Sequence, residues 1–336
     1  NLKHNIMDLS TTYMGLELEN PIIVGSSELT NKAQKVKKLA DAGAGAVVLK
    51  SLFEEQIMME VEAQRVNNIY GSFDNVENYV SFYTRKHNLD KYLDLIRESK
   101  DAVDIPVIAS INCISSSEWV DFATQIENAG ADGLELNVFI MPNDPKYDGR
   151  TLEKVYFDVV RNIRQHLTIP VALKLGTYFS GLASTFIELS KVGISAMVLF
   201  NRFYSPDVNL EKEEIRSSHI FSHPHDLSTS LRWIGILADQ VECDLSASTG
   251  VHDGYAVIKS LLVGAKTTHV VSALYQNSES HIKTMLDQME EWMESKGYQS
   301  LGDFRGKLSQ AHVKQPMMYE RAQFMRYYSN YGDAKY

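Results

Sequence analysis

The sequence alternates short apolar segments with longer segments of helical periodicity, and this alternation constrains the fold more than any other feature. Helical segments separate the apolar ones throughout the chain. The eight apolar or β-branched segments are Ile22–Val24, Ala46–Leu49, Val107–Ile111, Gly133–Leu136, Val171–Leu173, Ala196–Phe200, Leu245–Ser248 and the strand that ends at Ser272. An alternation with this count predicts an α/β fold, a TIM (β/α)8 barrel, with an open doubly wound sheet as the alternative.

The segments outside this alternation are expected to extend a single barrel domain. Residues Leu9–Leu18 are typical of an N-terminal hairpin, which would close the barrel floor. Residues 53–89 are long, polar and aromatic, so we expect an inserted cap or loop region over one mouth of the barrel. One domain is therefore expected over residues 1–312, followed by a helical C-terminal extension over 313–336.

The composition excludes several classes of partner. The 336 residues carry a formal charge of −10 without a basic tract, which argues against nucleic acid and against an anionic membrane surface. The two cysteines, Cys113 and Cys243, are too few for a disulfide framework and lack metal-site spacing, so no metal is expected. No apolar run reaches membrane-spanning length and no secretory signal is present, which predicts a soluble protein of the reducing cytoplasm.

Four predicted strands deliver a polar group at their carboxyl ends. These groups are Lys50, Asn137, Lys174 and Asn201. The carboxyl ends of all strands in a barrel meet at one rim, and that rim is the active-site face. Any one of them alone is ordinarily a lysine that reaches solvent or an asparagine that turns the chain. The four together predict a functional site.

The turns after the last two strands are suited to phosphate. The first turn carries Ser248, Thr249 and Gly250, and the second carries Val271 and Ser272. Small residues at a strand end let successive N–H groups form a concave anion site, and a nearby helix start adds its dipole. The alternative for one such turn alone is a glycine-containing connection without a ligand.

An ordered series of motifs resembles a known family. The series comprises NPIIVGSS, VVLKS, ELN followed by a PN pair, VALKL, the turn at Thr249, and KGYQSLGDFRGKL, between Leu9 and Leu308. It resembles the dihydroorotate dehydrogenases, which are FMN-containing barrels, and most of all the soluble dimeric class that uses fumarate. The resemblance implies FMN as cofactor, a small-molecule substrate and a homodimer.

The resemblance also implies roles for individual residues. Lys174 would lie beside the N1–C2 edge of FMN, where negative charge accumulates on reduction, and would stabilise that charge. Main-chain N–H groups near Gly250 and Ser272 would hold the phosphate. The full implied cofactor set is Gly25, Ser26, Ser27, Lys50, Ser51, Ser110, Asn137, Lys174, Asn201, Ser248, Thr249, Gly250, Val271 and Ser272.

The sequence departs from the family on the substrate side. The family's strand-four loop carries a cysteine or serine base, whereas this chain has Phe139, Ile140 and Met141, which cannot accept a proton. Arg202 replaces a small hydroxyl residue and would suit a carboxylate. The family's asparagine-bearing segment of the insert has no clean match, although Asn75 or Asn78 are candidates. The implied substrate residues are Lys50, Asn137, Asn143, Asn201 and Arg202.

The general base is therefore open at this point. Cys113 is the first candidate, and Tyr147, Tyr178, His223 and His225 are the others. We expect an FMN-dependent oxidoreductase of pyrimidine biosynthesis, or one that oxidises a related small metabolite by hydride transfer to FMN. The alternatives are a relative that binds FMN but has lost dihydroorotate activity, and a flavin-free phosphate-binding lyase or isomerase.

Overall fold

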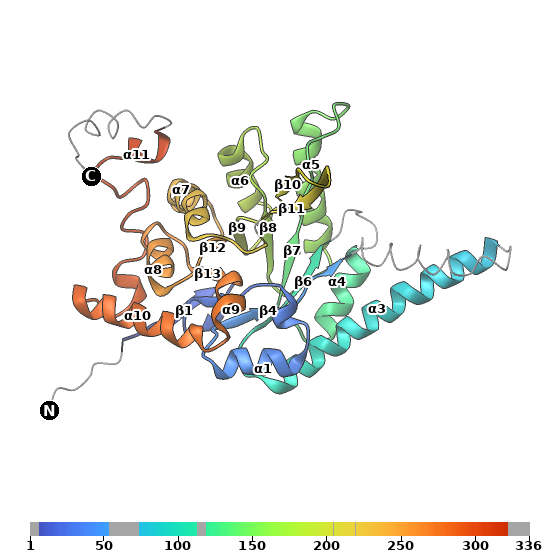
Figure 1. Cartoon of the computed structure of the whole chain (residues 1–336), viewed down its shortest axis with the longest axis horizontal. Coiled ribbons are helices and arrows are strands. Elements are labelled where there is room, and N and C mark those ends of the chain that lie inside the picture. Colours follow the sequence, from blue (N-terminus) through green and yellow to red (C-terminus); the bar gives the residue numbers. More distant parts are fainter. Residues whose placement is uncertain (1–6, 54–73, 113–118, 204, 219, 322–336) are drawn as a thin grey trace.

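A closed barrel of eight parallel strands forms the centre of the computed structural model, which describes residues 7–53, 74–112, 119–203, 205–218 and 220–321 (Figure 1). The barrel strands are β3 (Ile22–Val24), β4 (Ala46–Val48), β6 (Val107–Asn112), β7 (Gly133–Asn137), β8 (Val171–Leu175), β9 (Ala196–Leu199), β12 (Asp244–Ser248) and β13 (Thr267–Val270). Their hydrogen-bonded order is β4-β3-β13-β12-β9-β8-β7-β6, and pairing of β4 with β6 closes the ring. The predicted (β/α)8 barrel is confirmed, and the doubly wound alternative is wrong.

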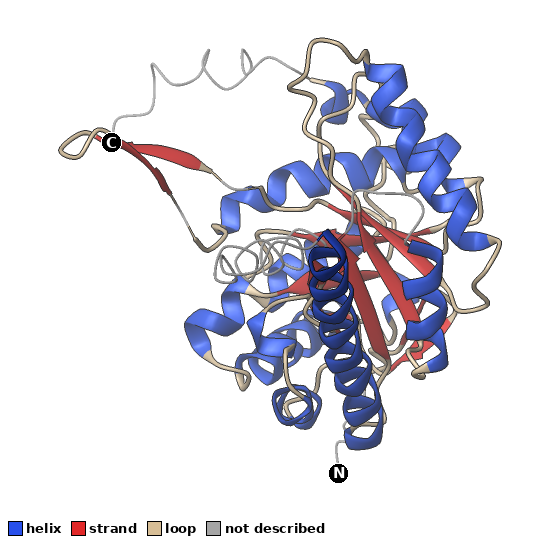
Figure 2. Cartoon of the chain, turned by 90° about the vertical axis from the view of Figure 1, so that its right-hand side faces the viewer, coloured by secondary structure: helices blue, strands red, loops and turns tan. Residues whose placement is uncertain are grey.

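Helices surround the strands on the outside of the barrel (Figure 2). They are α1 (Ala33–Asp41), α3 (Asp74–Ala102), α4 (Trp119–Asn128), α5 (Gly149–Arg164), α6 (Leu182–Ser190), α7 (Leu227–Leu237), α8 (Gly254–Leu262), α9 (Ser272–Asn277), α10 (His281–Lys296) and α11 (Met317–Glu320). Aspartates fix two of the starts, because Asp148 caps α5 and Asp253 caps α8 through side-chain bonds to main-chain N–H groups. None of the described helices is both long and apolar enough to cross a membrane.

The predicted hairpin closes the amino-terminal end of the barrel. It consists of β1 (Thr11–Tyr13) and β2 (Leu16–Leu18), which pair antiparallel. Tyr13 and Met14 pack into a buried cluster with barrel residues such as Ile23 and Ile108. The N–H of Met14 also donates to Oδ2 of Asp244 at the start of β12, 2.9 Å away. Because the hairpin covers the amino-terminal end, a ligand site is expected at the carboxyl ends of the strands.

Two parts of the chain differ from the sequence-based expectation, and the C-terminal extension lies largely outside the described residues. Residues from Asp74 onward belong to α3, so the second half of the expected 53–89 loop region is helical, while residues 54–73 lie outside the described part. A second antiparallel hairpin, β10 (Pro206–Asn209) and β11 (Glu214–Ser217), stands away from the barrel in Figure 2 and was not predicted. In the C-terminal extension the described structure holds only the short helix α11, and 322–336 lie outside it.

Candidate functional site

Three of the four predicted strand-end groups meet at one place on the rim. The register of β7 and β8 places Asn137 directly beside Lys174. Nδ2 of Asn201, which follows β9, donates a hydrogen bond of 2.9 Å to Oδ1 of Asn137. Neighbouring parallel strands thus bring together an ammonium and two amides that are 27 to 64 residues apart in sequence.

Lys50 lies at the rim but is already engaged. Its ammonium forms an ion pair with the Glu28 carboxylate, and its side chain is 31% exposed. The interaction lowers the pKa of Glu28, mainly through the hydrogen bond from Lys50. A role for Lys50 toward cofactor or substrate stays a prediction, since it would have to share its ammonium with Glu28.

A chain of hydroxyls crosses the opposite side of the rim. The N–H of Ser51 donates to Oγ of Ser26 at 2.8 Å, and Oγ of Ser51 lies 2.6 Å from Oγ of Ser110. Tyr92 fixes the last strand end, because its hydroxyl accepts from N–H of Ser110 at 2.7 Å and donates to its carbonyl at 2.9 Å. The three predicted serines therefore form one connected cluster. Tyr92 was missed, since it lies on α3 within a segment of weak helical periodicity.

Gly25 and Ser27, next to this cluster, have roles in the local backbone conformation. A Cβ atom at Gly25 would lie 2.9 Å from Cγ2 of Val271, so glycine lets β3 and the turn after β13 approach each other. The Ser27 hydroxyl accepts from N–H of Leu29 and thereby caps the short 3-10 helix Glu28–Thr30. The predicted contact of these residues with a flavin ring stays a prediction.

Lys174 stands above a buried carboxylate inside the barrel. Its Nζ lies 3.9 Å from Oε1 of Glu135, and the two side chains are 12% and 1% exposed. Oε2 of Glu135 lies 3.1 Å from Nε2 of buried His269, without hydrogen-bond alignment. Ser246 lies 2.8 Å from Nδ1 of His269 and accepts a hydrogen bond from Thr267. A polar column therefore runs down the barrel beneath the rim lysine.

The charges of this column fix the state of the carboxylate. Burial alone raises the pKa of Glu135, but the ammonium of Lys174 and the imidazole of His269 lower the pKa by more, so its net direction is downward. Among the described residues, Oε1 of Glu135 has no hydrogen-bond partner. Sequence reasoning missed Glu135 and His269. The available signal was a charged residue two places before Asn137 within an otherwise apolar strand.

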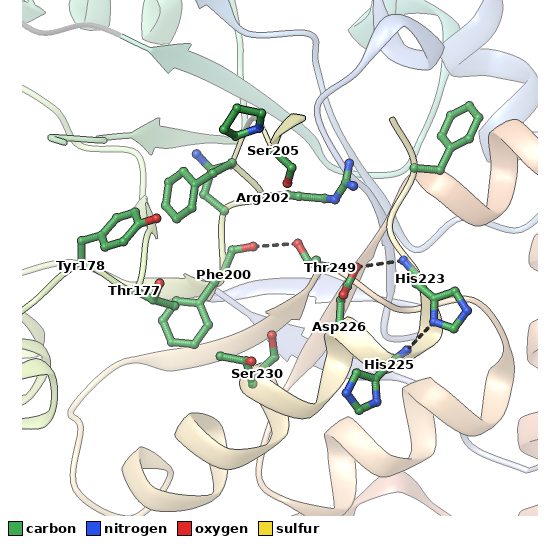
Figure 3. Close-up of a pocket in the computed structure, with 15 residues that line it drawn as sticks. Thr177, Tyr178, Phe200, Arg202, Ser205, His223, His225, Asp226, Ser230 and Thr249 are labelled. Atoms are coloured by element: carbon green, nitrogen blue, oxygen red, sulfur yellow. Dashed lines mark hydrogen bonds between the residues drawn. The ribbon is translucent and has the colours of Figure 1, made fainter. Parts of the chain in front are cut away.

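The two predicted phosphate turns are neighbours, as β12 and β13 pair in parallel with Ser248 beside His269. Thr249 and Gly250 both have positive φ, +72° and +82°. A Cβ at Gly250 would lie 2.3 Å from the main-chain N of Leu227, so only glycine fits against the start of α7. The Thr249 hydroxyl donates to the carbonyl of Phe200 at 3.0 Å (Figure 3).

A third segment ties down the second turn. The N–H of Ser222 donates to Oγ of Ser272 at 3.0 Å, and Oγ of Ser222 lies 3.1 Å from Nε2 of His252. Burial is the main cause that lowers the pKa of His252. Ser222 and His252 were not predicted, because the pairings span 30 and 50 residues and carry no local pattern.

Aromatic rings gather in the loops after β7, β8 and β9. The ring centroids of Phe139 and Phe203 are 4.3 Å apart, and those of Phe203 and Tyr178 are 5.1 Å apart. Gly176 makes room for this group, since a Cβ there would lie 2.4 Å from the Phe203 ring. Ile140 is held by its N–H, which donates to the Tyr156 hydroxyl at 3.2 Å. These three rings, Phe139, Tyr178 and Phe203, are called the aromatic cluster below.

A cavity of about 740 Å³ adjoins this cluster and the first phosphate turn (Figure 3). It brings together residues that the sequence suggested separately. These are Tyr178, Asn201, Arg202, His223, His225 and Thr249. The base candidate Tyr147 does not line this cavity and is 53% exposed in the loop before α5, and the predicted substrate residue Asn143 is exposed as well. Cys113 and the side chains of Asn75 and Asn78 lie outside the described residues.

The rim residues fit a flavin mononucleotide. The neighbouring turns after β12 and β13 carry small residues whose main-chain N–H groups suit an anionic phosphate. A ring that becomes anionic on reduction matches Lys174, whose ammonium is shielded from solvent beside an unpartnered carboxylate oxygen. No group of three histidine, cysteine, aspartate or glutamate side chains suited to a metal occurs among the described residues.

The fold and rim together define a (β/α)8 barrel with its site at the carboxyl ends of the strands. The family model for dihydroorotate dehydrogenase matches residues 8–293. The chain therefore belongs to the dihydroorotate dehydrogenase family, and this confirms the resemblance. It is an oxidoreductase of a family whose members are flavoproteins.

Three relatives illustrate the breadth of the family around this chain. The catalytic subunit of dihydroorotate dehydrogenase B (NAD(+)) from Thermoplasma volcanium is 23% identical, with 89% of this chain and 98% of the relative covered. Dihydroorotate dehydrogenase A (fumarate) from Lactococcus lactis is 24% identical, with 89% and 99% covered. The chloroplastic dihydropyrimidine dehydrogenase (NADP(+)) of Arabidopsis thaliana is 21% identical, with 89% and 76% covered. The similarity is nearly equal for all three, so it assigns the family and not the class.

Proposed function

We propose that the protein is an FMN-dependent oxidoreductase that takes hydride from a small reduced metabolite. The observation that carries this proposal is Lys174, a nearly buried ammonium 3.9 Å from the Glu135 carboxylate, on the strand position beside Asn137 at the barrel rim. A fixed positive charge at that place favours a bound ring that gains negative charge. FMN supplies the hydride-accepting chemistry when bound.

Residues on four strand ends would hold the cofactor. The turns at Thr249–Gly250 and at Val271–Ser272 would receive the phosphate through main-chain N–H groups. Valine at position 271 is compatible with phosphate binding in the second turn, because the proposed donor is its main-chain N–H group and not its side chain. The hydrogen-bonded pair Asn137 and Asn201 would face the ring system, because each amide keeps further donor and acceptor capacity. We also propose a homodimer, on family resemblance.

The substrate is proposed to be dihydroorotate or a related small acid. The loop after β7 argues for a relative of dihydroorotate, because Phe139, Ile140 and Met141 cannot accept the proton that dihydroorotate oxidation releases. The same observation favours one second candidate, a flavin protein without dihydroorotate activity. Membership of a family of flavoproteins disfavours a flavin-free lyase or isomerase.

Two measurements test the proposal in order. The full chain, isolated gently, is expected to carry FMN at about one per chain, measured by absorbance and by release of the flavin on denaturation. A colourless protein that takes up no added FMN would contradict the proposal. Anaerobic addition of dihydroorotate, and then of a panel of other reduced acids, shows which donor bleaches the flavin. Failure of every donor would favour the inactive flavin protein.

A further inference from the structure

The cavity beside the aromatic cluster has two chemically different ends (Figure 3). One wall carries rings, from Tyr178, Phe200 and Phe203 (Figure 3). The other carries Arg202 together with the segment His223–Asp226 and the first turn of α7. A volume of about 740 Å³ falls in the ordinary range of small-molecule sites.

The aromatic wall is built into the fold. Phe203 lies between Phe139 and Tyr178, with centroid distances of 4.3 and 5.1 Å. Its ring fits only because Gly176 has no side chain. Tyr178 is 49% exposed although it stands in this cluster, so one face of the wall is open to an incoming ring. Offset stacking on such rings adds about 0.5–1.5 kcal/mol beyond the area buried.

The arginine of the cavity reaches the polar wall from the loop that also carries Phe203. Arg202 extends toward the segment that carries His223 (Figure 3), and its Nη1 donates to the carbonyl of Ile220. The nearby carboxylate of Asp226 is turned to the backbone, where Oδ2 accepts from N–H of His223 at 2.9 Å. His223 in turn accepts from N–H of His225 at its Nδ1, 3.3 Å away. Arg202 is thus held by the backbone of the segment that carries His223.

The floor of the cavity leads to the proposed flavin site. Asn201 and Thr249 line the cavity and also belong to the rim described above. Ser230 closes the base by donating to the carbonyl of Ser248 at 2.9 Å. A ligand in the cavity would therefore lie next to a cofactor at the rim.

We propose that this cavity binds a flat aromatic carboxylate, with the carboxylate at Arg202 and the ring against Tyr178 and Phe203. Resting on the proposed function, the inference gives the product class of the same centre: a planar ring acid with more apolar surface than orotate, whose dihydro form would be the substrate that gives up a hydride and a proton. The guanidinium suits a carboxylate because its N–H groups form charge-assisted bonds with it. The rings of Tyr178 and Phe203 suit an aromatic ligand, because they can stack on its ring.

The test uses 2-naphthoate and its neutral counterpart 2-naphthamide as probes on the full chain with its flavin. Isothermal titration calorimetry is expected to show that naphthoate binds at least tenfold more tightly than naphthamide. Arg202→Gln should weaken naphthoate binding about tenfold to hundredfold, as expected for a lost charge-assisted bond. Arg216→Gln, on the exposed hairpin strand β11 where Arg216 pairs with Asp207, is the matched control and should bind normally. Phe203→Leu should weaken both probes severalfold.

Two outcomes would overturn the inference. One is absence of naphthoate binding to the unaltered chain, and the other is equal affinity in Arg202→Gln and Arg216→Gln. Thermal unfolding of each variant shows whether it is folded, and Phe203→Leu decides the question if Arg202→Gln is not. Failure of the proposed function is a separate result, because a chain without flavin still reports naphthoate binding and its dependence on Arg202. A naphthoate-induced change in the flavin spectrum supports the position of the cavity beside the cofactor.

Discussion

Glu135→Gln tests the buried column most directly. The substitution keeps the shape of the side chain and removes its charge, which leaves the Lys174 ammonium without the carboxylate 3.9 Å away. At an effective dielectric constant of about 20, two charges at this distance attract by about 4 kcal/mol. Since Lys174 is 12% exposed and water can take over part of the interaction, we expect a loss of about 2–4 kcal/mol in unfolding free energy.

The assay is urea unfolding followed by tryptophan fluorescence. Asp287→Asn is the matched control, because it removes a carboxylate from the exposed Lys283–Asp287 pair and should cost less than about 0.5 kcal/mol. The pKa of Glu135 is lowered in the folded protein, so its contribution is complete above the ordinary glutamate pKa of about 4.3. The contribution declines as the pH falls from there through the lowered pKa. Equal stability losses in the two variants, unchanged by pH, would refute the reasoning.

Three further predictions concern single residues. Lys174→Ala should retain some FMN but slow its reduction at least about a hundredfold, measured anaerobically by stopped flow; reduction at full speed would contradict the role given to this lysine. Gly250→Ala should cost at least 1 kcal/mol more than Gly297→Ala in urea unfolding, since both have positive φ but only Gly250 meets a neighbouring backbone; equal costs would count against the close approach. Burial raises the pKa of Cys243 to about 12, so at pH 8 its alkylation should be about a thousandfold slower than that of an exposed thiol. Peptide mass spectrometry measures this, and alkylation as fast as that of glutathione would exclude a buried thiol.

The strand-end part of the site could be predicted because it follows from topology alone. Once eight parallel strands are recognised, the groups after them, such as Asn137, Lys174 and Asn201, must meet at one rim. Several barrel strands, such as Ile22–Val24 and Ala46–Val48, are apolar on both faces, and this pattern is visible in sequence. The N-terminal hairpin was predictable for the same reason, since two short alternating segments flank the Met14–Gly15 turn.

The rest depended on pairings that sequence does not encode locally. Glu135 and His269 are 134 residues apart in numbering (269 − 135) and meet only because β7 and β13 face each other inside the barrel. Lys50 was correctly placed at the rim, but its partner Glu28 comes from a short 3-10 helix with no strong signal. The hairpin strands β10 and β11 are largely exposed, so they lack the apolar alternation by which strands are recognised.

The two ends of the barrel have different roles. The end closed by the hairpin stabilises the fold, and the rim at the carboxyl ends of the strands carries the candidate site. Two hydrogen bonds fasten the N-terminal segment to residues 299–305 at the closed end: Nη2 of Arg305 donates to the Thr11 hydroxyl at 2.7 Å, and N–H of Asp8 donates to the carbonyl of Gln299 at 2.8 Å. These bonds and the strand pairing that closes the ring do not involve the loops at the carboxyl ends of the strands. Those loops are then free to exchange polar groups for rings, as after β7, while the scaffold endures. The side chains that select the substrate can therefore change without loss of the folded barrel.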